Sequence, residues 1–370
     1  MNKFFVSLAL SVSIFSLSAY PSAVERNNFD FDKERWNSAN DPFAINPEFE
    51  KKLENLPLQG EVPQIPWSYS YWPSYEGGIA YRWNSSASED QKTPFKRKML
   101  TAAEVRSMSQ EELSSLSPAE KFDIYMGNFD FPTVARELQR TSSKDQKWEG
   151  ICHGWAAAAT NFPQEPKPVN LQGPSGILVP FGSSDIKALL AYYQGELTDA
   201  DSLVLGSRCE GGRFWHIGRF FFSNSCSDVN AGAFHIVLTN MIGKLGKSFV
   251  ADLTNGKEVW NFPVYSYRIQ KLRERNQPSF WAARGTVKEV DFKAVVNFAV
   301  ESTTDWQRIG HEDDSKVYYY HVELNKKGEI IGGIWDRVER PDFLWIQERP
   351  VFSGPYAQIE RIYNASVNIP

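Results

Sequence analysis

The chain has 370 residues, 42% of them hydrophobic and 23% charged, so it is long enough for one large domain or two ordinary ones. Its 40 Lys and Arg residues and 45 Asp and Glu residues give a formal net charge of −5. The chain also has no basic patch with interleaved aromatic residues. Together with the negative net charge, this excludes a basic nucleic-acid-binding surface. The 12 Trp, 15 Tyr and 25 Phe residues can fill a sizeable core or line an aromatic groove.

The N-terminal segment predicts export. Residues 1–19 contain one Lys, then an apolar run from Phe4 to Leu17, then small residues. The run is short and Ser-rich, which favours a signal peptide cleaved near Ser18 or Ala19 over a retained anchor. No other apolar stretch is long enough to span a bilayer. We therefore expect a secreted protein, either extracellular or periplasmic.

Three further regions follow in chain order. Residues 20–64 are polar and predict an extended leader, either partly ordered against the main domain or removable as a pro-segment. Residues 65–370 are expected to form the main domain, which ends in β-hairpins. Within it, the stretch 65–83 is dense in Trp and Tyr. It predicts a loop that packs aromatic rings on the core or, alternatively, one wall of a substrate groove.

Helix signals dominate the first half of this domain and strand signals the second. Thr101 and Ser117 are each followed three residues later by Glu, the pattern of a helix capping box, and residues 183–193 predict another amphipathic helix. Residues 288–300 and 316–324 predict strands. Residues 325–328 then read as a hairpin turn, with 329–335 as its return strand. Residues 335–345 suggest a further hairpin.

A single cysteine marks the most informative stretch, Trp148-Glu149-Gly150-Ile151-Cys152-His153-Gly154-Trp155-Ala156-Ala157-Ala158-Ala159-Thr160. Cys152 stands where a glycine-marked turn gives way to an alanine-rich run of high helix propensity. At a helix N-terminus a thiol faces unpaired backbone N–H groups and the positive end of the helix dipole. Both favour the thiolate, which is the nucleophilic form. Cys152 is therefore the predicted nucleophile.

Two partners lie downstream of this cysteine. His235, within residues 232–239, and Asp252, within residues 248–253, each stand in a stretch that predicts a short strand. A cysteine on a helix, a histidine on a strand and an aspartate on the next strand suit a papain-like or transglutaminase-like thiol enzyme. His235 would move the proton, and Asp252 would orient the imidazole. The spacing alone does not establish contact.

Several blocks of the chain resemble the transglutaminase elicitor family, known from oomycete cell-wall proteins and from bacteria. The resemblance rests on residues 148–155, 233–243 and 249–267. The last block contains Glu258-Val259-Trp260-Asn261-Phe262-Pro263-Val264, which is similar to the core of the family's elicitor peptide. Phe262, Tyr265 and Ser266 depart from the oomycete peptide, so host recognition does not carry over.

The resemblance implies an α+β fold with a transglutaminase-like, papain-type core, in which the Cys152 helix packs on an antiparallel sheet that bears His235 and Asp252. It implies protein-glutamine γ-glutamyltransferase activity, with acyl transfer from a glutamine side chain to a primary amine through a Cys152 thioester. A cysteine peptidase or a glutamine deamidase on the same triad is the alternative within enzymes. A non-catalytic secreted binding protein is the alternative outside them.

Further residues are candidates for supporting roles. The backbone N–H of Cys152, the Gln146 side chain and the Trp148 indole could serve the oxyanion. Trp155 and Trp260 could line the substrate groove. The three cysteines favour a local disulfide between Cys209 and Cys226 that leaves Cys152 free, and a pairing with Cys152 is the rival.

The other histidines are weaker candidates for a catalytic or metal-binding role. His153 would point about 100° round the helix from Cys152, so it is expected to be exposed or capping. His216 lies between Cys209 and Cys226 and could approach the cleft, but no partner acid is visible nearby, so a structural or surface histidine is favoured. His311 and His321 show no metal-ligand spacing. Relatives with transglutaminase activity can require calcium, but the chain has no EF-hand loop, and Glu312-Asp313-Asp314 reads as a solvated turn.

Overall fold

The computed structural model describes residues 36–207, 228–254 and 258–368, all within the compact unit Asp32–Pro370. A separate unit, Met1–Phe31, holds the predicted signal peptide and lies outside the described residues, as do Cys209, His216 and Cys226. The α-helices within the described ranges are α1 (Glu89–Lys92), α2 (Ala102–Ser107), α3 (Gln110–Ser114), α4 (Pro118–Met126), α5 (Pro132–Arg140), α6 (Cys152–Asn161), α7 (Ser183–Tyr192), α8 (Ala231–Leu238) and α9 (Gln358–Ser366).

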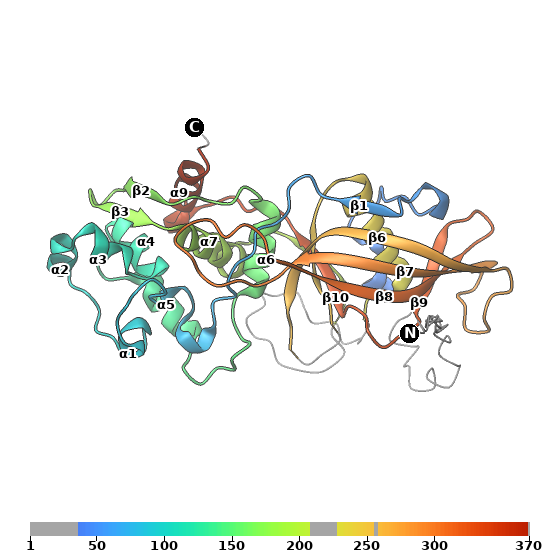
Figure 1. Ribbon diagram of the computed structural model, residues 1–370, viewed down its shortest axis with the longest axis horizontal. Helices are drawn as coiled ribbons and strands as arrows, with labels where there is room; N and C mark the ends of the chain where they lie inside the picture. Colours follow the sequence, from blue (N-terminus) through green and yellow to red (C-terminus); the bar gives the residue numbers. More distant parts are fainter. Residues whose placement is uncertain (1–35, 208–227, 255–257, 369–370) are drawn as a thin grey trace, which may run out of the picture. The chain divides into compact units, whose positions relative to one another are not determined.

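One large antiparallel sheet runs through the unit. Its strand order is β4-β10-β5-β6-β7-β8-β9, with β1 paired to β6 as an eighth strand (Figure 1). These strands are β1 (Gln59–Glu61), β4 (Ser202–Gly206), β5 (Phe249–Asp252), β6 (Asn261–Arg275), β7 (Lys288–Ala299), β8 (Asp313–Leu324), β9 (Ile330–Trp335) and β10 (Phe343–Gln347). The strands β2 (Val169–Gln172) and β3 (Leu178–Phe181) form a small separate hairpin. The predicted mixture of helices with an antiparallel sheet is confirmed.

Local sequence signals account for many of these elements. The capping boxes at Thr101 and Ser117 are both formed, with Glu104 and Glu120 closing them, and they begin α2 and α4. The predicted turn at 325–328 joins β8 to β9, and Gly328 has the positive φ of 75° that such a turn requires. The prediction of a hairpin across residues 335–345 is wrong. β10 instead pairs with β4 and β5, which lie at the other end of the sheet.

A second correction concerns the stretch around His235, which is helical and not a strand. The Asn230 side chain caps α8 by accepting from the N–H groups of Gly232 and Ala233. A π-helical turn over residues 239–244 extends the helix. A Cβ on Gly232 would lie 2.2 Å from the Gly332 carbonyl oxygen, so α8 approaches β9 more closely than a larger residue allows. The capped start and this close packing override the β-branched pair Ile236 and Val237, which had suggested a strand.

The central strand β5 separates two packing regions. Phe249, Ala251 and Leu253 belong to the core cluster that contains α8. Val250 instead packs with Ala156 and Ala157 of α6. Because side chains alternate between the faces of a strand, α8 and α6 cover opposite faces of the sheet near β5.

Most of the other helices lie to one side of α6 (Figure 1). A second core cluster joins α6 and α7 to α4 and α9, and Figure 1 shows this helical group on the opposite side of α6 from the long strands β6 to β9. Gly154 of α6 lies against α7, since a Cβ there would be 2.2 Å from the Ala191 carbonyl oxygen. This close contact fixes the start of α6, and with it Cys152, against the helical group.

Part of the predicted leader is built into the fold. Ile45, Phe49, Leu56 and Val62 are buried in the core cluster that contains α8. β1 pairs with β6 in register, with Gly60 opposite Tyr267. Between residue 36 and residue 64, the segment therefore contributes apolar side chains and one strand to the packing around the sheet.

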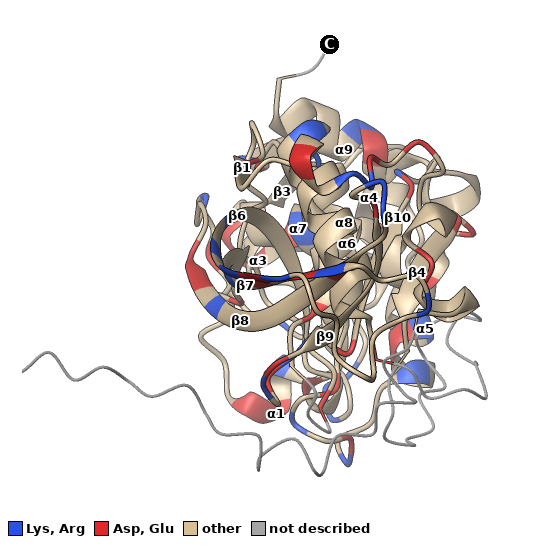
Figure 2. Ribbon diagram, turned by 90° about the vertical axis from the view of Figure 1, so that its right-hand side faces the viewer, with Lys and Arg blue, Asp and Glu red and all other residues tan. Residues whose placement is uncertain are grey.

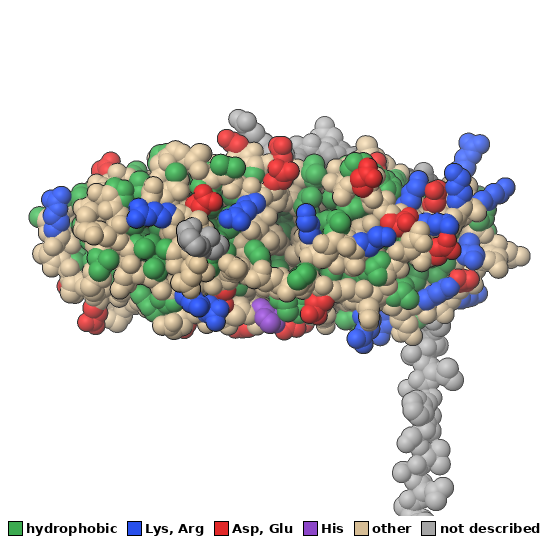
Figure 3. Space-filling model, turned by 90° about the horizontal axis from the view of Figure 1, so that it is seen from above, with side chains coloured by type: hydrophobic (Ala, Val, Ile, Leu, Met, Phe, Trp, Pro, Cys, Tyr) green, Lys and Arg blue, Asp and Glu red, His purple; other side chains and the backbone are tan. Residues whose placement is uncertain are grey.

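Charged residues are interspersed by sign over the described surface. Figure 2 shows Lys and Arg alternating with Asp and Glu along the ribbon, and the face in Figure 3 has both kinds scattered among hydrophobic side chains. Within the described residues, no helix has the length and apolar character needed to cross a membrane.

Candidate active site around Cys152

Cys152 is the first residue of α6 and a free, buried thiol. The turn before it is held tightly. The Ile151 N–H donates to the Tyr71 carbonyl at 2.7 Å, and a Cβ on Gly150 would lie 2.4 Å from the same oxygen. This glycine lets the aromatic segment around Tyr71 fix where α6 begins. The thiol consequently stands at the positive end of the helix dipole, as the sequence predicts.

Two groups from the start of β6 contact the sulfur. The Cys152 Sγ lies 3.7 Å from the Val259 carbonyl oxygen and 3.6 Å from the Asn261 Nδ2. The indole N–H of Trp345, on β10, donates to the Asn261 Oδ1 at 2.8 Å. Because Trp345 occupies the oxygen of this amide, the NH2 group is directed at the sulfur. The family-like segment 258–264 therefore borders the thiol.

His153 is buried next to this thiol, contrary to the expectation that it would be exposed. Its Nε2 lies 3.5 Å from the Glu196 carboxylate. Burial lowers the pKa of His153, but hydrogen bonding to Cys152 and the negative charge of Glu196 outweigh burial and raise the pKa to about 9. The imidazole is therefore protonated at neutral pH, between a sulfur and a carboxylate. The sequence argument missed this because Glu196 comes from the π-helical turn after α7.

Asp252 lies at the end of β5 and is fully buried. It stands directly opposite Asn261 in the sheet, and the alternation along β5 places it on the face that α6 covers. Its Oδ1 accepts from the backbone N–H and the hydroxyl of Thr254, both at 3.3 Å. The structure thus brings Asp252 and Cys152 to the same part of the fold, with Asn261 contacting one and paired with the other.

His235 is placed differently. On α8, its Nδ1 lies 2.9 Å from the Tyr320 hydroxyl, and its ring packs on Phe292 at a centroid distance of 5.0 Å. These contacts belong to the face of the sheet opposite α6. Burial lowers the pKa of His235 to about 3, so the ring is neutral at physiological pH. The structure does not bring His235 to Cys152 or Asp252, because the segment expected to carry it as a strand is a helix on the other face.

The residues predicted to support the oxyanion or to line the substrate groove differ in where they lie. The Trp148 indole donates to the Gln146 Oε1 at 3.3 Å, so these two oxyanion candidates contact each other. Trp155 is fully buried and donates to the Trp67 carbonyl, which makes it a core residue and not a groove residue. Trp260 is half-buried, and its ring meets Tyr71 edge-on at 5.3 Å.

A cavity of about 450 Å³ is lined in part by Tyr71. Its lining is rich in aromatic and acidic side chains: Ser70, Tyr71, Trp72, Pro73, Glu76, Tyr81, Trp83, Glu301, Ser302, Thr303, Thr304 and Glu312. Burial raises the pKa of Glu301 to about 8. Burial, followed by the charges of Tyr75 and Glu301, raises the pKa of Tyr71 to about 12.

The chain was compared with known proteins. The sequence profile described as Transglutaminase elicitor matches residues 43–357. Among solved structures, the crystal structure of the GP42 transglutaminase from Phytophthora sojae is similar, with a TM-score of 0.65 and 22% identity over 90% of this chain and 99% of that chain. At this identity the likeness shows the fold. A search of curated proteins found no match.

Proposed function

Because the chain belongs to the transglutaminase elicitor family, we propose that it is a protein-glutamine γ-glutamyltransferase that uses Cys152 as its nucleophile. The observation that carries this proposal is the buried sulfur at the start of α6, contacted by the Asn261 amide and followed directly by His153, whose pKa its neighbours Cys152 and Glu196 raise to about 9. A thiol at a helix N-terminus with a proton-transfer group beside it has the surroundings of a catalytic cysteine. Residues 1–19 would direct the protein to export.

The chemistry needs two acyl-transfer steps. The Cys152 thiolate attacks the carboxamide carbon of a substrate glutamine. The C–N bond then breaks, and the His153 imidazolium gives its proton to the departing ammonia. A thioester remains. A primary amine attacks this thioester and passes a proton to His153, the C–S bond breaks, and the new amide leaves while the Cys152 thiolate and the His153 imidazolium are restored.

The oxyanion of each tetrahedral intermediate requires donors already in place. The backbone N–H groups at the start of α6 have no partner within the helix, as at any helix N-terminus. The Asn261 Nδ2, 3.6 Å from the sulfur, is a second donor close to the reacting carbon. We assign Asn261 this stabilising role, and Trp345 the task of orienting it.

The cavity lined in part by Tyr71 suits the amine acceptor. An ammonium group is attracted by aromatic faces and by carboxylates, and Tyr71, Trp83 and Glu301 supply both. With its pKa raised to about 8, Glu301 can take the ammonium proton and so free the neutral amine for attack.

The decisive experiment is incorporation of a labelled primary amine into a glutamine-rich protein, with and without calcium. We expect incorporation by the wild type, none by Cys152→Ala, and wild-type levels by Thr160→Ala. The latter removes a hydroxyl that bonds only the Ala157 carbonyl further along α6. Release of ammonia or of new peptide termini without amine incorporation would favour the hydrolase alternative. Equal inactivity of the wild type and Cys152→Ala would favour a binding protein.

A further inference from the structure

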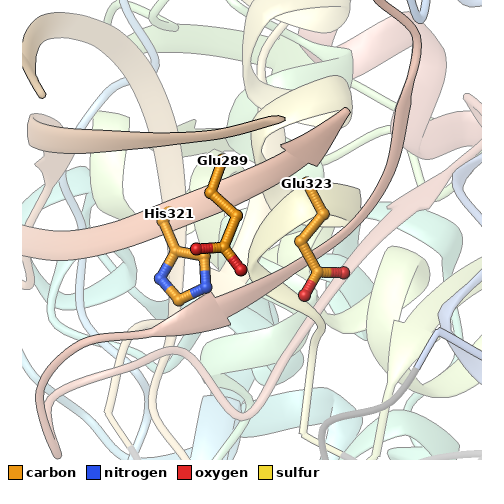
Figure 4. Close-up of side chains that lie close together, drawn as sticks. All are labelled: Glu289, His321 and Glu323. Carbon is orange, nitrogen blue, oxygen red and sulfur yellow. The ribbon is translucent and has the colours of Figure 1, made fainter. Parts of the chain in front are cut away.

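A cluster of buried polar side chains lies on β7 and β8, away from the thiol. Glu289, His321 and Glu323 are exposed by 0%, 2% and 3%, and Figure 4 shows their polar ends gathered on one side of the sheet. One potential ligand atom from each residue lies within 4.8 Å of those of the other two. Sequence spacing did not reveal the cluster, because Glu289 comes from a different strand.

The strand register forces the two carboxylates together. Glu289 and Glu323 are directly opposite each other in the β7–β8 ladder, and His321 shares their face two residues before Glu323. Like charges directly opposite in a ladder destabilise a sheet, and burial increases the cost. The pair therefore requires positive charge nearby.

Each of the two carboxylates also accepts hydrogen bonds or an ion pair from residues outside the cluster. Glu289 Oε1 accepts from the N–H and hydroxyl of Ser279, while Arg275 pairs with its Oε2 at 2.9 Å. Glu323 Oε2 accepts from the Ala283 N–H at 3.1 Å. The loop between β6 and β7 thus fixes both side chains. The single Arg275 charge is shared with Asp291, so it does not neutralise the pair.

The imidazole supplies the second, independent observation. His321 Nδ1 lies 2.9 Å from the Asp336 Oδ1, which fixes the ring and makes Nδ1 the protonated nitrogen. The buried Nε2 then presents a lone pair toward the two carboxylates, and among the described residues it has no hydrogen-bond partner. A histidine oriented by a carboxylate, with its other nitrogen turned to acidic oxygens, is the usual arrangement of a metal ligand.

We propose that Glu289, His321 and Glu323 bind a divalent transition-metal ion of the zinc class, with water completing the coordination shell. One nitrogen and two carboxylate oxygens suit Zn²⁺ and its neighbours better than calcium, which takes six or more oxygen ligands. The ion would neutralise the opposed carboxylates and tie the β6–β7 loop to β7 and β8. This role is structural and independent of the chemistry at Cys152.

Metal binding is tested on the full chain carrying Cys152→Ala, so that this thiol cannot hold the ion. The chain is stripped with chelator and dialysed against Zn²⁺, and its metal content is measured. We expect one bound ion and a rise in Tm of roughly 5 °C at saturating Zn²⁺. The Co²⁺-loaded chain should show a ligand-field absorption band without a thiolate-to-cobalt band.

The variants separate ligands from neighbours. His321→Gln should weaken Zn²⁺ binding at least 100-fold, and Asp336→Asn, which removes only the orienting contact, about 10- to 100-fold. Glu274→Gln, a surface carboxylate on β6 paired with Lys271 and Lys288, should bind like the parent. If the parent binds no Zn²⁺, or if His321→Gln and Asp336→Asn bind it as tightly, the cluster is instead an imidazolium bridge and the proposal is overturned.

Discussion

Two buried histidines, one on each side of the central sheet, show how much the surroundings of a side chain decide its chemistry. His153 lies between Cys152 and Glu196, which together raise its pKa to about 9 despite burial. His235 lies among Phe292 and Tyr320, and burial alone lowers its pKa to about 3. Both residues stand on helices and both are hidden from solvent. The difference between them comes from charged partners that only one of them has.

This contrast teaches that the pKa of a buried histidine depends on elements distant in sequence. Glu196 reaches His153 from the turn after α7, and Asn261 reaches Cys152 from the start of β6. The segment of His235 carries a family-like pattern, yet it packs against an apolar face. The predictions below test whether the two sides of the sheet divide into a reactive face and a structural face.

The largest expected effect is on catalysis at His153. His153→Gln should lower kcat/KM for amine incorporation by about 10²- to 10⁴-fold, because no group would move the proton between Cys152 and ammonia. The wild type should also lose activity as the pH rises through about 9, where the imidazolium deprotonates. The variant should lack this alkaline decline. Both are read from steady-state rates between pH 6 and 10.

His235→Gln is the matched control. We expect the folded variant to retain nearly full activity per molecule, with unchanged dependence on pH. If it abolished the alkaline decline while His153→Gln kept it, the proton-transfer role would move to His235 and the division between the two faces would fail.

The sequence predicted well that Cys152 stands at the start of a helix, because the evidence was local. Gly150 permits the tight turn, the alanine run favours a helix, and Cys152 falls at the junction of the two. The strand of Asp252 and the hairpin around Gly328 followed from local patterns in the same way. Where a secondary-structure preference depends on a few neighbouring residues, tertiary packing did not change it.

Other features could not be predicted because they depend on packing. The short apolar run at His235 fits a buried strand and a buried helix equally, and only the Asn230 cap and the close contact at Gly232 decide between them. Trp345 seemed to belong to a hairpin with β9, yet it orients Asn261 from the opposite end of the sheet. Which distant strands pair with each other cannot be predicted from the spacing of residues along the chain.

The next effect concerns Asn261. Asn261→Ala should lower kcat about 10²- to 10³-fold, the usual effect of removing one oxyanion donor, with a smaller change in KM. Asn297→Ala removes an asparagine from the neighbouring strand β7, where its amide donates to the Ser266 hydroxyl, and should leave kcat unchanged. An equal loss in both variants would indicate damage to the sheet and not to the reaction.

A further test addresses the structural face through acid stability. Folded His235 stays neutral down to about pH 3, whereas the unfolded imidazole binds a proton below its ordinary pKa of 6.5. Its contribution to stability is therefore complete above pH 6.5. It should decrease by up to about 1.4 kcal/mol per pH unit as the pH falls toward 3.

Denaturant titrations of the wild type and His235→Gln at each pH measure this slope. The variant is expected to be less stable at pH 7, because a buried bond to Tyr320 is altered, but flatter toward acid. The raised pKa of His153 has the opposite sign. It stabilises fully below pH 6.5 and loses its contribution as the pH rises through 9. Parallel acid slopes in wild type and variant would contradict the neutral, structural assignment.

The smallest effect is expected at the cavity lined in part by Tyr71. Glu301→Gln should raise the KM for the amine about fivefold with little change in kcat, since one partly solvated carboxylate contributes about 1 kcal/mol to binding an ammonium. In the wild type this KM should fall as the pH rises through 8, where Glu301 ionises, and in the variant it should not. Glu360→Gln, a half-exposed carboxylate on α9, serves as the control. If the KM for the amine had the same pH dependence in all three proteins, the amine would not bind in this cavity. The reactive face would then not extend beyond Trp260.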